Sequence, residues 1–168
     1  MVATALARVS EVAINLTAIP RGVTGFWRLG EPPLGQVDER EFRAAVHEVA
    51  RTVEAVVAAP LSDSLSCNFF RCTIAYSGAE RTVVCNRYAP LVALAEPMQS
   101  CELGLTFVDD PHVARAFASL SRFEVLSPHD LSRPPADFDL SELGTIELEQ
   151  IRHWNPQTLG EVVFNWWD

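Results

Sequence analysis

The sequence contains no lysine, because all 13 of its basic residues are arginine. High-GC codon usage is sufficient to produce such a bias. The absence nevertheless excludes reactions that need a side-chain amine. Schiff-base chemistry, pyridoxal-phosphate attachment, a Walker A phosphate loop and a kinase-type phosphate site all depend on lysine. A large part of enzyme chemistry is therefore closed to this chain.

Familiar catalytic and metal-binding motifs are also missing. The sequence has no GxSxG, HExxH, GxGxxG or EF-hand pattern. Its four cysteines show neither a CxxC pair nor zinc-ribbon spacing. We therefore expect free, buried thiols, as is usual in a reducing compartment, and we predict no metal and no cofactor.

Long apolar runs are absent too. No stretch approaches the ~18 apolar residues of a membrane-spanning helix. The opening MVATALARVSEV has no basic region, and Thr4 and Arg8 interrupt its apolar residues, so it does not resemble a secretory signal. These features predict a cytoplasmic protein without membrane contact.

The chain has 168 residues, of which 48% are hydrophobic, and no linker-like stretch divides it. We predict a single globular domain over 1–168. The fold class that we expect is α+β, with a mainly antiparallel sheet of about five to six strands and helices packed on it. The patterns below define the elements.

In the first half, alternation of apolar and polar residues predicts a strand at 10–19. A glycine-rich connection follows at 20–37. Asp38 and apolar residues spaced by three and four then predict a long helix at 39–58. The segment CNFFRCTIAYSGAERTVVCNRY is typical of a β-hairpin, and a two-residue Gly78-Ala79 turn would place Cys72 opposite Cys85.

The second half alternates short strands with helices. Strands are expected at 101–107 and 123–127, and 90–97 is either another short strand or a connecting segment. Asp110 as a cap, followed by Pro111, predicts a short helix at 111–120. We expect the proline-rich segment 127–143 to be irregular. TIELEQIRHW fits either a strand or a helix, and we favour a helix from 141 or 145.

The C-terminal segment is predicted to be a helix from about 156, because Asn155 can cap it and Pro156 can occupy its first turn. At helical spacing Trp166 and Trp167 lie on its buried side. The polar residues gather on a narrow opposite stripe. This stripe consists of Glu161, Asn165 and Asp168.

Negative charge is concentrated in the second half of the chain. The net charge is −9, and residues 85–168 contribute −8 of it, from 5 arginines and 13 acidic residues. Such a charge repels phosphate backbones, so we predict no binding to nucleic acid. The acidic residues form either a solvated face that aids solubility or a docking surface for a basic partner.

Two groups of residues are candidates for function. The candidate binding residues are Trp27, Asp137, Asp139, Glu142, Glu147, Glu161, Asn165 and Asp168. Trp27 lies in the 20–37 connection, where it either packs over the core or contacts a ligand. The catalytic candidates are Asp109, Asp110 and His112, which lie at a strand-to-helix junction. Asp110 and Pro111 already have a sufficient explanation as a helix start.

Three functions are compatible with these features. The first is a non-enzymatic inhibitor of the immunity or antitoxin type, which would bind a basic protein such as a toxin domain. The second is a small lysine-free hydrolase, isomerase or cyclase that uses Asp and His, with the 20–37 connection as a lid. The third is a subunit of a larger complex. The sequence leaves the oligomeric state open.

Overall fold

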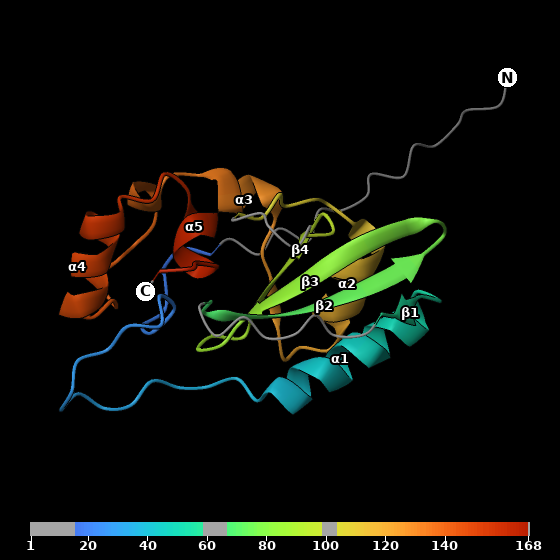
Figure 1. The fold of residues 1–168 in the computed structure, drawn as a ribbon, viewed down its shortest axis with the longest axis horizontal. Helices are drawn as coiled ribbons and strands as arrows, with labels where there is room; N and C mark the ends of the chain where they lie inside the picture. The colour runs from blue at the N-terminus through green and yellow to red at the C-terminus, as the bar shows by residue number, and fades with distance from the viewer. Residues whose placement is uncertain (1–15, 59–66, 99–103, 168) are drawn as a thin grey trace, which may run out of the picture.

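The chain folds around a five-stranded sheet whose strands follow one another in sequence order (Figure 1). The computed structural model describes residues 16–58, 67–98 and 104–167. The strands are β1 (Val56–Val57), β2 (Phe69–Tyr76), β3 (Ala79–Asn86), β4 (Leu91–Ala95) and β5 (Glu124–Val125). The first four strands pair antiparallel, and β5 pairs parallel with β4. This confirms the predicted α+β class and the mainly antiparallel sheet.

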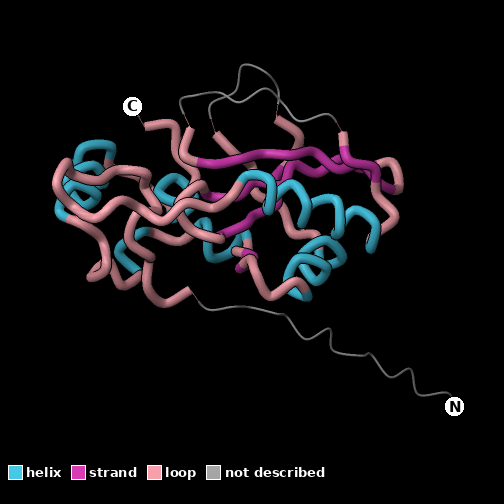
Figure 2. The backbone as a smooth tube through the Cα atoms, turned by 90° about the horizontal axis from the view of Figure 1, so that it is seen from below, coloured by secondary structure: helices cyan, strands magenta, loops and turns pink. Residues whose placement is uncertain are grey.

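The two faces of the sheet are covered by different parts of the chain (Figures 1 and 2). On one face, α1 (Glu39–Thr52) and α2 (Pro111–Ser119) bury Phe42 and Phe117 in one apolar cluster with Val83. The next strand residue, Val84, points the opposite way and joins Phe164 in a second cluster. The period of two in β3 therefore separates the two cores, and the C-terminal segment forms the second one.

The long helix starts as predicted but ends earlier. Asp38 caps α1 by accepting a hydrogen bond from the Arg40 amide at 2.8 Å. The helix stops at Thr52 rather than at 58, because Glu54 adopts a left-handed conformation with φ of 56°. The chain then reverses into β1, where β-branched valines pair with β2. Val56, which continues the helical spacing of apolar residues past Thr52, thus belongs to the edge strand β1.

The hairpin is confirmed, but its predicted register is wrong by two residues. Ser77 and Gly78 form the turn, with φ of 49° and 76°, and two positive φ values are typical of a type I′ turn. Cys72 consequently lies opposite Val83, not opposite Cys85. A shift of two leaves every side chain on its predicted face, because the strand period is two.

In the described parts of two predicted strands, the structure contains single bridges. The strand predicted at 10–19 lies mostly outside the described residues, and Ala18 forms one parallel bridge with Asp139. Of the strand predicted at 101–107, the last residue, Phe107, forms one antiparallel bridge with Ala95. The predictions at 90–97 and 123–127 correspond to β4 and to the shorter β5.

The helices of the second half follow local capping. Asp110 caps α2 as predicted, with its side chain accepting from the Val113 amide. The segment predicted to be irregular contains α3 (Pro128–Ser132), capped by the Ser127 hydroxyl, and the 3-10 helix η1 (Pro135–Asp137). The prediction of an irregular segment was wrong because it rested on the proline-rich composition. Ser127 can cap a helix, and Pro128 is suited to its first turn.

The last two helices divide the C-terminal segment differently from the prediction. The predicted helix α4 (Thr145–Trp154) is present. Asn155 ends α4 in a left-handed conformation instead of starting the next helix. Thr158 caps α5 (Leu159–Val163), so the C-terminal helix begins later than 156 and ends before Trp166 and Trp167.

Candidate protein-binding surface

A buried carboxylate ties the 20–25 loop to α4. Glu147 is 1% exposed, and its Oε2 accepts from the Gly144 amide at 3.0 Å at the start of the helix. Its Oε1 accepts from the Gly22 amide at 2.9 Å and from the Thr24 hydroxyl at 2.8 Å. Gly22 has φ of 90°, which glycine adopts without strain. The expectation that Glu147 lies on an exposed acidic surface is wrong, because these buried donors surround it.

Asn165 is buried as well, so the predicted polar stripe is not continuous. It is 3% exposed, and its Nδ2 donates to the carbonyls of Thr24 at 3.1 Å and Val162 at 3.0 Å. The backbone amide of Asn165 donates to Oδ1 of Asn68 at 2.8 Å. Asn165 therefore fastens the tail to the interior and is not exposed to a partner. Asp168, the third member of the stripe, lies outside the described residues.

Two further asparagines complete this internal network. The side-chain amides of Asn68 and Asn86 both donate to the carbonyl of Val23, each at 2.8 Å. Both also donate to the carbonyl of Val163, at 3.1 and 2.6 Å. One end of the β2–β3 ladder thus holds the 20–25 loop and the tail in fixed positions. This pair could not be recognised from the sequence, since the spacing of 18 residues becomes meaningful only in the hairpin.

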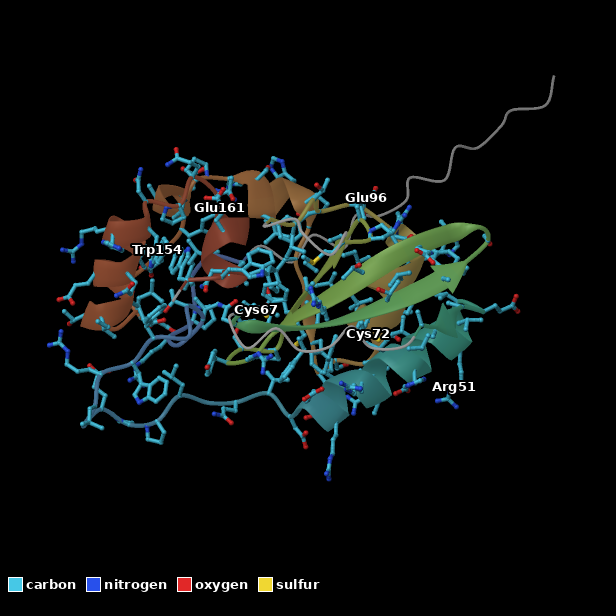
Figure 3. The ribbon with its side chains drawn as sticks, viewed as in Figure 1. Arg51, Cys67, Cys72, Glu96, Trp154 and Glu161 are labelled. Atoms are coloured by element: carbon cyan, nitrogen blue, oxygen red, sulfur yellow. The ribbon has the colours of Figure 1, made fainter. Side chains whose placement is uncertain are left out.

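The tail contributes to an aromatic groove, which we call the tail groove. It has a volume of about 600 Å³ and is lined by Trp154, Trp166 and Trp167 together with Phe107, Phe164 and Glu161. The Trp166 ring packs edge-on against Phe69, with centroids 4.9 Å apart. The Trp167 and Trp154 rings are parallel to within 5°, with centroids 6.2 Å apart. Figure 3 labels Trp154 on α4 and Glu161 on α5, at the end of the molecule where these two helices lie.

Glu161 gives the tail groove a negative charge. The residue is exposed, and its Oε2 accepts from the Gln157 amide at 2.7 Å. Across the three described segments, no arginine forms an ion pair with Glu161. An uncompensated carboxylate therefore lies among partly exposed aromatic rings.

Of the predicted acidic surface, Asp137, Asp139 and Glu142 are exposed. Asp137 pairs with Arg133 at 3.4 Å, so its charge is partly compensated. Asp139 accepts a hydrogen bond from the Ser141 amide at 2.9 Å, and hydrogen bonding by Ser141 lowers the pKa of this carboxyl. Asp139 and Glu142 form no ion pair with a described arginine.

Comparison with protein-family models, with curated proteins and with solved structures found no match. Among the described residues, no helix combines the length and the apolar character needed to cross a membrane. The chemistry of the tail groove and of its surroundings is therefore the basis for inferring a function.

An exposed apolar tip lies beside α4. Trp27 is 50% exposed and Leu29 is 99% exposed, so Trp27 is not enclosed by the core. Between them, Arg28 pairs with Glu149 of α4 at 3.4 Å. In Figure 1 the blue connection that carries this tip runs outside the main body, at the same end as α4. The base of the connection is fixed by Glu147, which leaves the tip as a supported protrusion.

The catalytic candidates do not converge on one site. Asp110 is buried, its Oδ1 accepts from the Val113 amide at 3.3 Å, and the Tyr76 hydroxyl donates to its Oδ2. Burial, and then the bond to Asp110, raise the pKa of Tyr76 to about 12. Asp109 and His112 are exposed, and His112 lines a separate hollow that Asp109 does not reach. Within the described residues, no His, Cys, Asp and Glu side chains are grouped so that they could hold a metal.

Proposed function

We propose that this protein is a non-enzymatic, cytoplasmic protein-binding protein, an inhibitor of the immunity or antitoxin type that holds a basic partner against its C-terminal surface. The observation that carries the proposal is the tail groove, which Trp154, Trp166 and Trp167 line together with Glu161, a carboxylate that no described arginine neutralises. Tryptophan is among the residues that contribute most to binding energy at protein interfaces. Partly exposed aromatic rings beside an unpaired charge are therefore well suited to an interface.

The charge of the chain supports a basic partner. The net charge is −9, and most of it belongs to the half that contains the tail groove. Asp139 and Glu142 add exposed carboxylates in the same part of the chain. Opposite charges steer two proteins together and discriminate against partners of the wrong sign. A basic partner is therefore favoured both by electrostatic steering and by discrimination against acidic proteins.

The Trp27 tip supplies a second contact. Its exposed side chains, Trp27 and Leu29, are apolar, and the loop at its base is held by the buried Glu147. An anchor that is ordered before binding loses less conformational entropy when the complex forms. We therefore assign this tip to the partner interface, where it would enter an apolar depression next to the basic surface.

The use of Asp110 in the fold favours binding over catalysis. Both of its carboxylate oxygens are engaged, one by the start of α2 and the other by Tyr76. A general base needs an oxygen that can reach the substrate proton. Asp110 does not offer one, and this weakens the alternative of a small enzyme based on Asp109, Asp110 and His112.

The test is affinity capture from lysate of the native organism, with the full chain as bait. We expect one basic protein to be retained in stoichiometric amount at low salt and released at about 1 M salt, where the Debye length is about 3 Å. Glu161→Arg should abolish capture. Glu80→Arg is the matched control, because Glu80 is an exposed acid on β3 outside the tail groove.

The captured protein is then assayed for its own activity with and without this chain. Inhibition at equimolar ratio supports the inhibitor proposal, whereas full activity in the complex contradicts it in favour of a subunit role. Failure to capture a basic protein, or equal capture by Glu161→Arg, contradicts the proposed function itself.

A further inference from the structure

We propose that the tail groove is a site for one arginine side chain of the partner, with the guanidinium stacked on tryptophan and paired with Glu161. This inference rests on the proposed function and adds the chemical group that the groove recognises. It is carried by three features of the groove, namely its parallel indole rings, a carboxylate oxygen that accepts no hydrogen bond from a described residue, and its apolar lining.

The indole rings are oriented before any ligand arrives. Nε1 of Trp154 donates to Oε1 of Gln150 at 3.1 Å, one turn earlier in α4. The Trp167 amide donates to Oδ1 of the buried Asn165 at 3.3 Å, which fixes the chain at that point. A fixed aromatic face attracts a cation through its quadrupole, and tryptophan does so most strongly. The two rings are stacked on each other and nearly parallel, so a flat cation that stacks on the outer face of either ring takes the same orientation.

The carboxylate of Glu161 provides the charged partner. Its Oε2 is engaged by the Gln157 amide, and no hydrogen bond to Oε1 is present among the described residues. The Thr158 hydroxyl, in turn, accepts from the Glu161 amide at 3.3 Å and fixes the backbone at the start of α5. A guanidinium donates charge-assisted hydrogen bonds to such an oxygen. The ion pair between the guanidinium and Glu161 would give the electrostatic attraction a defined geometry.

The remaining lining suits the stem of an arginine. Phe107, Leu131 and Phe164 are apolar and border the same groove, whose volume is about 600 Å³. Arginine buries its methylene stem along apolar surface and keeps its charged end in a polar environment. Lysine carries a compact, strongly hydrated ammonium group without a flat face, so it uses parallel rings less well. No arginine of the described segments is among the residues that line the groove.

The composition of the chain supplies a direct readout. The protein has four tryptophans, and three of them line the tail groove. In a Trp27→Phe background, tryptophan fluorescence therefore reports on the groove alone. The probes are N-acetyl-arginine amide, the corresponding lysine amide and the corresponding citrulline amide, which matches the shape of arginine but carries no charge.

We expect a saturable fluorescence change with the arginine amide and several-fold weaker binding of the lysine and citrulline amides. Glu161→Gln should weaken arginine binding by about two- to five-fold, the range that corresponds to one partly exposed ion pair. Glu80→Gln should leave it unchanged. Trp154→Ala should remove the saturable change, and Glu161→Gln keeps the test valid if that variant fails to fold.

Equal affinity for arginine and citrulline, or for arginine and lysine, overturns the inference. An unchanged affinity in Glu161→Gln does the same. These results are separable from failure of the proposed function. If the captured basic protein is lost with Glu161→Arg while the arginine amide does not bind, the proposed function stands and the arginine site is wrong. If the amide binds but no basic protein is captured, the proposed function fails.

Discussion

Replacing Glu147 by alanine should destabilise the protein strongly, although the residue is a charged side chain without an arginine partner among the described residues. The carboxylate accepts from the amides of Gly22 and Gly144 and from the hydroxyl of Thr24, all at 2.8–3.0 Å. Alanine removes the acceptor and leaves the buried donors of Gly22 and Thr24, and the partly buried Gly144 amide, without it. The 20–25 loop would then lose its attachment to α4.

The magnitude follows from the number of donors. A buried donor without a partner costs about 1–3 kcal/mol. With two buried donors and the partly buried Gly144 amide, partly relieved by local movement, we expect a loss of about 3–5 kcal/mol in the free energy of unfolding. This is a large fraction of the ~5–15 kcal/mol that stabilises a typical domain. Glu147→Gln should have a smaller effect, because one oxygen remains as an acceptor.

Urea unfolding of the purified chain, followed by circular dichroism, measures this difference. Glu142→Ala is the matched control, since Glu142 is an exposed acid just before α4 and should change stability by less than about 0.5 kcal/mol. A loss of less than about 1 kcal/mol for Glu147→Ala would refute the reasoning, because the donors would then have found other partners.

Two further predictions concern packing and ionisation. Gly160→Ala places a methyl carbon 2.5 Å from a ring carbon of Phe107, so urea unfolding should show a loss of about 1–3 kcal/mol in the free energy of unfolding. Gly35→Ala is the control and should be near neutral, because its new carbon would meet its nearest neighbour at 3.8 Å. Tyr76 has a pKa raised from 10.0 to about 12, so its contribution to stability is complete below pH 10 and is lost as pH rises towards 12. Ultraviolet titration should show this late ionisation in the wild type and not in Tyr76→Phe; a single step near pH 10 contradicts it.

The parts of the fold that could be predicted from sequence are those set by local interactions. Asp38, and Asp110 with Pro111, mark helix starts that need only their neighbours, and both are correct. The end of α1 could not be predicted in this way, because the same apolar spacing continues into β1. The left-handed turn at Glu54, and not the pattern, decides where the helix stops.

The predictions of the hairpin turn and of the start of the C-terminal helix were wrong for a related reason, since the local sequence allows two conformations in each case. Ser77-Gly78 competes with Gly78-Ala79 as a turn, and Asn155 serves as well at the end of a helix as at its beginning. Packing of the sheet and of the tail selects one of the two. The local sequence pattern does not show which of the two is selected.

The candidate site was predicted in part. Glu161 is exposed, as its place on a polar stripe indicated, and Trp27 is half exposed. The burial of Glu147 and Asn165 could not be foreseen, because the partners that enclose them, Gly22 and Asn68, lie more than 90 residues away in the chain. The available signal was the position of Glu147 three residues after Gly144, which is where a carboxylate caps a helix start.

The most direct test of the central claim is calorimetric titration of the captured basic partner into the wild-type chain and into Glu161→Gln, at several salt concentrations. We predict a one-to-one complex whose Kd rises with ionic strength, and a weaker complex with a smaller salt dependence for Glu161→Gln. A Kd that depends on neither salt nor Glu161 would contradict the assignment of the tail groove as the binding surface.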